Sequence, residues 1–171
     1  MLLITMSCQE DPAADLPPAT QEGKNTLACL IDNNRWTQYS SDFKQSSSIA
    51  YYFSGPKTLL IRGRDDTKRQ FIGFAITNYD GKLGAYKLDS SCTDLPQVCA
   101  NLGFYNTDPS PSVSSNTIYL TDFKNTGQVT ITRHTPSFVS GTFEFMARHK
   151  VTGKTVRITN GRFDMPYRTS Y

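Results

Sequence analysis

Four cysteines carry the most distinctive chemistry in this sequence, because a thiol can accept lipid, form a disulfide or bind a metal. Cys92 and Cys99 enclose the short loop TDLPQV, and we expect a disulfide between them if the chain matures in an oxidising compartment. Cys29 lies in the apolar run LACLI and is expected to be a buried small hydrophobe. No C-x-x-C or H-x-x-x-H pair completes a zinc ligand set, so we predict no metal site.

Cys8 follows the apolar run MLLITMS, whose last residue is small. This arrangement resembles a bacterial lipobox, in which a signal peptidase cuts before the cysteine and the thiol receives a diacylglyceryl group. A complete signal also has a positive charge and a longer apolar segment, so we expect the native precursor to begin further upstream. We predict that an acylated Cys8 anchors the protein to a membrane; the alternative is an N-terminal strand with an incidental cysteine.

Residues 9–23, QEDPAADLPPATQEG, have the composition of a linker. They hold several prolines and acids but no Lys or Arg. Such a stretch favours extended, solvated backbone, and we predict an acidic tether between the lipid and a single β domain at residues 24–171. The basic residues all lie in that domain, and we interpret them as solvated surface charge. No RRM or helix-turn-helix pattern is present, so a nucleic-acid partner is not expected.

The other residues that could act as acids or bases do not form a catalytic set. His134 and His149 each follow an arginine near the end of an expected strand, and we interpret both as surface residues. Asp65 and Asp66 lie in the polar loop RGRDDTKR. Adjacent strand residues point to opposite faces, so paired acid–base chemistry is not favoured and solvated charge is expected. One acidic pair is also too small a ligand set for calcium.

The elements that would position these residues are strands. Apolar residues recur with period two, as in Phe143, Phe145 and Ala147 against Glu144 and Arg148, and helical spacing is scarce. We predict an all-β domain of about ten antiparallel strands, either a β-sandwich or a meander barrel. The expected strands are 26–31, 48–53, 58–62, 70–77, 83–88, 101–105, 117–121, 129–132, 142–149, 154–159 and a last short one that opens at Phe163. Only 41–45 and 94–100 have any helical character.

Turn and glycine positions refine this prediction. Asp80-Gly81 and Thr152-Gly153 are expected to form hairpin turns, because glycine accepts a positive φ. Gly141 indicates a bulge or a close backbone approach inside a strand, and Gly161 is expected to separate two strands. Trp36 is expected to cover one end of the core.

Two groups of motifs resemble a family of uncharacterised small lipoproteins from Bacteroidota-type bacteria. At the N-terminal side these are LPPATQ at 16–21, CLIDN at 29–33 and Trp36. At the C-terminal side they are GxVxIT from Gly127, VSGTFxFxA from Val139 and ITxGRFD from Ile158. The resemblance implies a small β domain on a lipid anchor at the outer membrane or cell surface, and it implies no activity. The triplet after Cys8 also resembles an acidic export tag for the cell surface.

Two functions from different classes fit these observations. The first is a non-enzymatic envelope lipoprotein whose β domain binds a glycan, a peptide or another envelope protein. Its support is an excess of tyrosines that could be exposed, namely Tyr39, Tyr51, Tyr52, Tyr79, Tyr86, Tyr105 and Tyr119. The alternative is a lipocalin-like barrel that carries a lipid or small hydrophobic molecule. An enzyme is not expected, because no nucleophile, cofactor motif or matched acid and base is found.

Overall fold

Every regular element in the described part of the chain is a β-strand. The computed structural model describes residues 11–40, 49–90, 101–108 and 117–170, with side chains described as far as residue 166. The strands are β1 (Thr26–Ile31), β2 (Asn34–Thr37), β3 (Ile49–Phe53), β4 (Thr58–Asp65), β5 (Gln70–Ile76), β6 (Gly84–Leu88), β7 (Leu102–Asn106), β8 (Ile118–Leu120), β9 (Gly127–His134), β10 (Phe138–His149) and β11 (Thr155–Ser170). No helix that could cross a membrane is found in these ranges. The all-β prediction is confirmed, while the segments 41–45 and 94–100 fall outside the described residues.

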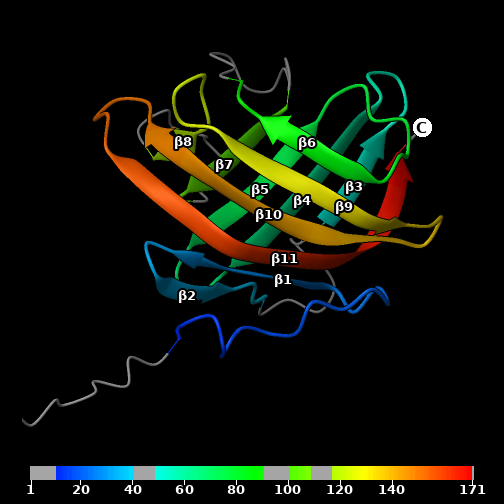
Figure 1. Ribbon diagram of the computed structural model, residues 1–171, viewed down its shortest axis with the longest axis horizontal. Coiled ribbons are helices and arrows are strands. Elements are labelled where there is room, and N and C mark those ends of the chain that lie inside the picture. Colours follow the sequence, from blue (N-terminus) through cyan, green and yellow to red (C-terminus); the bar gives the residue numbers. More distant parts are fainter. Residues whose placement is uncertain (1–10, 41–48, 91–100, 109–116, 171) are drawn as a thin grey trace, which may run out of the picture.

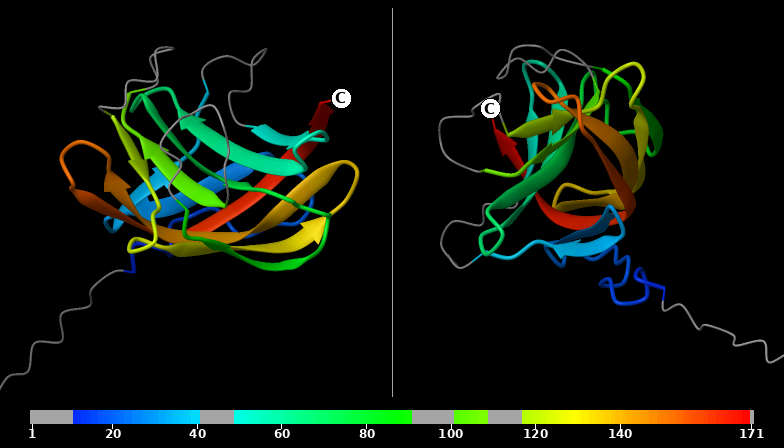
Figure 2. Two further views of the ribbon diagram at one scale, coloured as in Figure 1. Left: turned by 90° about the horizontal axis from the view of Figure 1, so that it is seen from above. Right: turned by 90° about the vertical axis from the view of Figure 1, so that its left-hand side faces the viewer.

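The eleven strands form one large sheet that is antiparallel except where β3 meets β11. The sheet is not closed into a barrel; it folds into two facing layers (Figure 1). The front layer has the order β6-β9-β10-β11-β1-β2, and the back layer has the order β3-β4-β5-β7-β8. The layers meet where the end of β11 pairs with β3 and where β8 pairs with the end of β10. Figure 2 shows the two layers from above and from the side.

The core fills the space between the layers. From Thr142 to His149 of β10 the residues alternate between exposed and buried positions, and Phe143, Phe145 and Ala147 are buried. Phe143 and Phe163 of the front layer pack on Phe74 of the back layer, with ring centroids 5.6 and 5.2 Å apart. Burying large aromatic side chains in this way is a dominant stabilising contribution in a β-sandwich. Trp36 is also buried in this core, at 1% exposure.

The pairing of the strands tests the two predicted hairpin turns. The Thr152-Gly153 turn joins β10 and β11 as predicted, and Gly153 has φ +72°. The Asp80-Gly81 hairpin was wrong, because β6 crosses to the front layer and pairs with β9 rather than with β5. Turn residues indicate that the chain changes direction, but they do not predict which strand the next strand pairs with.

The two interior glycines behave differently. A Cβ on Gly141 would lie 2.0 Å from the carbonyl oxygen of Thr130, which confirms the predicted close approach. The register of the pair also shifts here, but the extra residue is Thr132 of β9, so the bulge lies in the neighbouring strand. Gly161 does not separate two strands, because β11 runs without a break from Thr155 to Ser170. It lies instead at a bulge inside that strand.

Candidate binding face

A buried carboxylate fastens the N-terminal segment across the outer surface of the front layer. Asp164 and Ser140 occupy outward positions of β11 and β10, yet they are only 1% and 0% exposed. They are buried because residues 20–24 cover them. One carboxylate oxygen of Asp164 accepts hydrogen bonds from the Thr20 hydroxyl (2.6 Å) and from the backbone N–H groups of Glu22 (2.9 Å) and Lys24 (3.0 Å). The other accepts from the Gly23 N–H (2.8 Å) and the Ser140 hydroxyl (2.7 Å).

This arrangement keeps Asp164 ionised. Burial alone raises the pKa of a carboxyl group, because it disfavours the charged form. Here the hydrogen bonds donated by Thr20, by the backbone and by Ser140 outweigh that effect and hold the pKa of Asp164 well below its usual range. A positive φ at Gly23 (+73°) lets the chain curl around the carboxylate. We call Asp164 with its five donors the clasp.

Contacts on both sides of the clasp hold the same segment. The Arg162 guanidinium donates to the carbonyl oxygen of Pro17 at 2.9 Å, and Leu16 is buried against Ala28 and Leu30. The expectation that residues 9–23 form a solvated spacer therefore needs correction from Leu16 onward. The composition of this stretch is that of a linker, but a carboxylate and a guanidinium from the far end of the sequence supply hydrogen bonds that a linker lacks.

A β-bulge in β11 changes which side chains face outward. Ile158 and Gly161 are both buried, so the inward phase of the strand resets between them. The two residues in between, Thr159 and Asn160, are both off the inner face, and Asn160 adopts a left-handed φ of +52°. Bulges of this kind redirect side chains and are frequent beside functional sites. A Cβ on Gly161 would lie 2.4 Å from the Phe143 carbonyl oxygen, so this position has room only for glycine.

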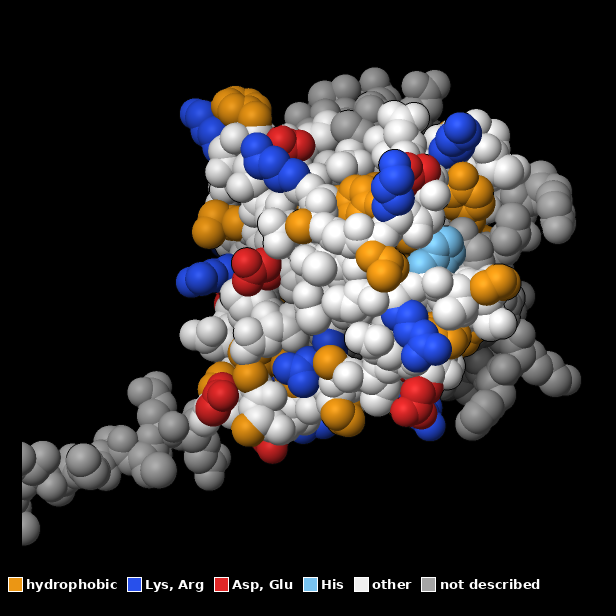
Figure 3. All heavy atoms as spheres, turned by 45° about the vertical axis from the view of Figure 1, so that its right-hand side comes forward, with side chains coloured by type: hydrophobic (Ala, Val, Ile, Leu, Met, Phe, Trp, Pro, Cys, Tyr) orange, Lys and Arg blue, Asp and Glu red, His pale blue; other side chains and the backbone are white. Residues whose placement is uncertain are grey.

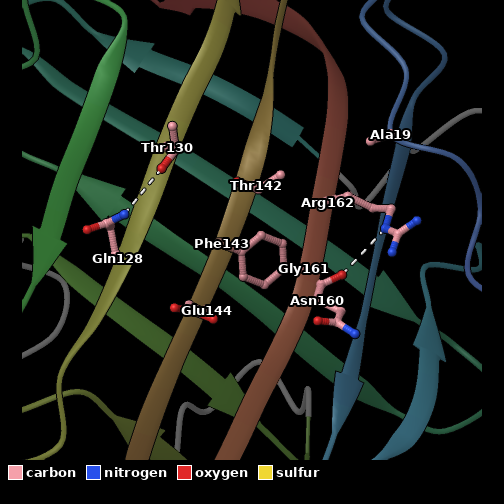
Figure 4. Close-up of a pocket in the computed structure, with 9 residues that line it drawn as sticks. All are labelled: Ala19, Gln128, Thr130, Thr142, Phe143, Glu144, Asn160, Gly161 and Arg162. Carbon is pink, nitrogen blue, oxygen red and sulfur yellow. Dashed lines mark hydrogen bonds between the residues drawn. The ribbon is translucent and has the colours of Figure 1, made fainter. Parts of the chain in front are cut away.

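The bulge lies between two adjoining hollows on the outer surface of the front layer. The first has a volume of about 430 Å³, and the labelled residues around it come from β9, β10, β11 and the N-terminal segment (Figure 4). The second has a volume of about 610 Å³ and extends to β6. Gln128 and Glu144 line both hollows, and they are direct cross-strand neighbours in the register of β9 and β10. We call the surface that contains the two hollows the binding face.

The N-terminal segment limits the binding face at one end. Ala19 lines the first hollow, and Gln21 reaches β9, where its carbonyl oxygen accepts a hydrogen bond from Arg133 at 3.1 Å. The segment therefore crosses β11, β10 and β9 just beyond the row formed by Arg162, Thr142 and Thr130. The clasp thus has a geometric consequence, because it holds one wall of the first hollow in place.

The charged groups of the binding face nearly balance. Lys87 forms an ion pair with Asp89 at 3.0 Å. Arg157 and Arg162 remain as cations, with the exposed carboxylate of Glu144 between the two hollows. Arg162 gives one donor to Pro17 and another to the carbonyl oxygen of Asn160 at 3.4 Å. Strong attraction for a highly charged ligand is therefore not built into this surface.

The cysteines predicted to carry chemistry are only partly covered by the structure. Cys8, Cys92 and Cys99 lie outside the described residues, so lipidation and the disulfide stay predictions. Cys29 is a free, fully buried thiol, as expected. Burial raises the pKa of this thiol far above its usual range, which leaves it a packing residue rather than a nucleophile.

Both histidines have structural roles that sequence reasoning missed. His149 is buried rather than exposed, and its Nδ1 accepts hydrogen bonds from the backbone N–H groups of Val151 and Thr152 at 3.2 and 3.0 Å. These bonds shape the turn between β10 and β11. His134 is half-buried against the ring of Tyr79, with centroids 5.4 Å apart. The two imidazoles lie at different sites, and neither lines the binding face.

The Asp65-Asp66 pair also differs from expectation. Asp65 is 3% exposed, and its Oδ1 accepts hydrogen bonds from the Thr67 hydroxyl and from the backbone N–H groups of Thr67 and Lys68. This residue closes the turn between β4 and β5 and is not solvated charge. Among the described residues no group of three or more metal-ligating side chains comes together.

The tyrosines do not build the exposed patch that the sequence suggested. Tyr39 is 53% exposed, but Tyr79 and Tyr105 are buried in the core. The remaining four, Tyr51, Tyr52, Tyr86 and Tyr119, are half-buried. On the surface seen in Figure 3, hydrophobic side chains are scattered rather than gathered. The seven tyrosines therefore do not form one exposed platform on the described surface.

Four candidate residues that sequence reasoning missed lie in one motif. Thr159, Asn160, Arg162 and Asp164 all belong to ITNGRFD, which was noted for its resemblance and not for chemistry. The available signal was an Asn-Gly pair inside an alternating strand, which is typical of a left-handed residue at a bulge.

A family model described as "Domain of unknown function (DUF6252)" matches residues 37–165. The matched range includes β3 to β10 and most of β11, and it ends just after Asp164. No curated protein and no solved structure matches the chain.

Proposed function

We propose that this chain, which belongs to the family described as domain of unknown function (DUF6252), is a cell-envelope lipoprotein. In this proposal its β domain acts as a non-enzymatic binding module through the binding face. The observation that carries the proposal is the pair of polar hollows bounded by the clasped N-terminal segment. A folded segment that walls a hollow preorganises the hollow, which lowers the entropic cost of binding. The ligand classes are a glycan, a peptide or another envelope protein.

The proposed anchor lies at the outer membrane or cell surface, attached through Cys8. Because the chain is packed on the domain from Leu16 onward, only the stretch between Cys8 and Leu16 is left as a spacer. Fully extended, that stretch reaches at most about 30 Å. The binding face would then stay close to the lipid surface and would meet ligands that are themselves part of the envelope.

The packed core supports a surface binder over the lipocalin-like carrier. A carrier needs an interior cavity between its strands. Here the space between the layers holds the buried rings of Phe74, Phe143 and Phe163, in contact with one another. A hydrophobic ligand would have to displace them.

Chemistry on a bound substrate is not supported by the side chains of the binding face. Catalysis of hydrolysis needs a nucleophile or a matched acid and base within hydrogen-bond reach of one another. Glu144 is an exposed carboxylate without a neighbouring histidine or cysteine among the residues that line the hollows. We therefore propose binding without turnover.

The anchor is tested by labelling cells with a palmitate analogue. The wild-type precursor is expected to become labelled and to sediment with membranes, and the Cys8→Ser variant to lose both properties. An unlabelled wild-type protein would refute the anchor but not the binding module.

The binding module is tested with residues 11–171 against panels of glycans, peptides and envelope proteins. Thr142 is an exposed residue of the first hollow, so Thr142→Trp is expected to weaken strongly the binding of the ligand that the panel identifies. Thr155→Trp is the matched control, since Thr155 is an exposed residue of β11 outside both hollows, and it is expected to bind normally. Equal binding by both variants, or a blank panel, would reject the binding face.

A further inference from the structure

The side chains of the two hollows indicate which of the proposed ligand classes the binding face takes. This inference rests on the proposed function. The uncharged polar side chains that line the hollows all end in a hydroxyl or amide group, and they outnumber the four charged ones. They are Thr126, Gln128, Thr130, Thr142, Thr159 and Asn160. Hydroxyls both donate and accept hydrogen bonds, and amides offer one acceptor and two donors. Such groups match a ligand whose surface is also made of hydroxyls.

The charges exclude ligands that carry a high charge of one sign. Lys87 is neutralised by Asp89, and the two remaining arginines have Glu144 between them. A polyphosphate or nucleic acid would gain little here, because binding to phosphates depends on a cluster of uncompensated basic residues. An uncharged ligand fits this balance.

The backbone of β9, β10 and β11 has no open edge to which an extended peptide could add as a new strand, and the nearest open edge among the described strands of this layer lies at β6, at the margin of the second hollow. β9, β10 and β11 each have a paired strand on both sides, so their backbone groups are already used in the sheet. Strand addition requires an open edge. The side chains also lack a deep aromatic anchor site, since Phe143 and Phe145 point inward at 3% exposure and Met146 is the exposed apolar residue of the second hollow. Protein interfaces usually depend on such anchors.

The two hollows adjoin and present similar groups, which indicates a ligand with repeated units. The bulge in β11 gives Thr159 to the second hollow and Asn160 to the first. Gln128 and Glu144 lie at the junction and line both. A single small molecule would fill only one hollow.

We infer that the binding face takes an uncharged linear oligosaccharide that occupies both hollows, with Gln128 and Glu144 at the junction between adjacent sugar units. The wall that includes Ala19 limits the chain at the first hollow. Asn160, held in a left-handed conformation by the bulge, presents its amide to the sugar hydroxyls.

The experiment is calorimetric titration of the full chain with length series of neutral oligosaccharides, from monosaccharide to hexasaccharide, taken from several linkage types. The expected result for the recognised linkage is an affinity that rises at least 10-fold between one unit and the length that fills both hollows, and then stays constant. Gln128→Ala and Asn160→Gly are each expected to weaken binding by about 10-fold, since each removes hydrogen-bonding groups. The glycine variant keeps the left-handed backbone.

Two blocking variants test the pair of hollows directly. Thr142→Trp fills the first hollow and Met146→Trp fills the second. Each is expected to leave only weak binding that no longer depends on chain length, while Thr155→Trp keeps the full dependence. Circular dichroism and a cooperative urea transition confirm that each variant is folded, because the added tryptophan obscures the fluorescence of Trp36.

The outcomes separate this inference from the proposed function. Equal affinity for monosaccharide and hexasaccharide, or tighter binding of uronic-acid oligosaccharides than of neutral ones, would overturn the inference. The proposed binding module would still stand. The same holds if a peptide or an envelope protein binds in a manner sensitive to Thr142→Trp while no oligosaccharide binds. A protein that binds none of these overturns both.

Discussion

Replacing Asp164 by asparagine tests whether the clasp is a major source of stability. The substitution keeps the shape of the side chain but turns one acceptor oxygen into a donor. In the better orientation the new amide group replaces the oxygen that faces Gly23 and Ser140. The Ser140 hydroxyl can rotate to accept, but the Gly23 N–H is left without its acceptor, which costs about 1–3 kcal/mol.

The other hydrogen bonds also weaken when the charge is lost. Thr20, Glu22 and Lys24 donate to the second oxygen, and each bond to a charged acceptor is worth roughly 1 kcal/mol more than a bond to a neutral one. With allowance for non-additivity, we expect Asp164→Asn to lower the free energy of unfolding by about 3–5 kcal/mol. That is a large part of the 5–15 kcal/mol that is typical of a domain.

Urea unfolding measures this loss, and the fluorescence of Trp36 provides the signal because Trp36 is the only tryptophan and is buried. Ser140→Ala removes one donor and is expected to cost about 1 kcal/mol. Asp80→Asn is the control, because Asp80 is exposed and pairs only with Lys82 at the surface, so it is expected to change little. Hydrogen exchange of residues 16–24 should increase in the Asp164 variant. A loss below about 1 kcal/mol, with unchanged exchange, would refute the clasp.

The same group gives a pH dependence with a definite sign. Because the pKa of Asp164 is lower in the folded state than in the unfolded state, its contribution is fully present above the unfolded value, about 3.9. It is lost as the pH falls through the folded value. Wild-type stability should therefore drop more steeply than that of Asp164→Asn as the pH is lowered below about 4. Parallel curves would contradict this assignment.

Three further changes test the core, the bulges and the buried thiol. Phe74→Ala removes the ring that contacts Phe143 and Phe163 and should cost about 3–5 kcal/mol in urea unfolding; a loss under 1 kcal/mol would mean that the layers do not pack as described. Asn160→Ala should cost about 1 kcal/mol because alanine is strained at a positive φ, whereas Asn160→Gly should not, and the reverse order would contradict the left-handed conformation. Cys29 should resist alkylation by iodoacetamide in the native protein and react after unfolding, because it is buried and its pKa is raised; rapid native labelling would count against this.

The sequence predicted the strands well because their signal is local. In β10, apolar and polar residues alternate over the whole second half of the strand, and the structure buries the apolar ones. The same local pattern led to the wrong prediction that Gly161 separates two strands, because a bulge interrupts the alternation without ending the strand. It also could not predict that β6 pairs with β9, since strand pairing depends on contacts between segments that are distant in the sequence.

The clasp could not be predicted for the same reason. Asp164 bonds to the backbone of Gly23, which lies 141 positions away in the sequence. Nothing local distinguishes this aspartate from an exposed one at an outward strand position. Likewise, the prolines and acids before Gly23 have a linker composition, and only the distant partners Asp164 and Arg162 convert that stretch into a wall of the binding face.

The last strand determines when the domain can become complete. β11 pairs with β10, β1 and β3, and it supplies both residues that fasten the N-terminal segment. A chain that emerges N-terminus first, from the ribosome or from a membrane channel, cannot pair β3 with β11 until β11 has emerged. It cannot form the clasp before Asp164 has emerged. A chain that stops before residue 164 would lack the clasp and the pairing of β11 with β3, so we expect such a product to be open and sensitive to proteases.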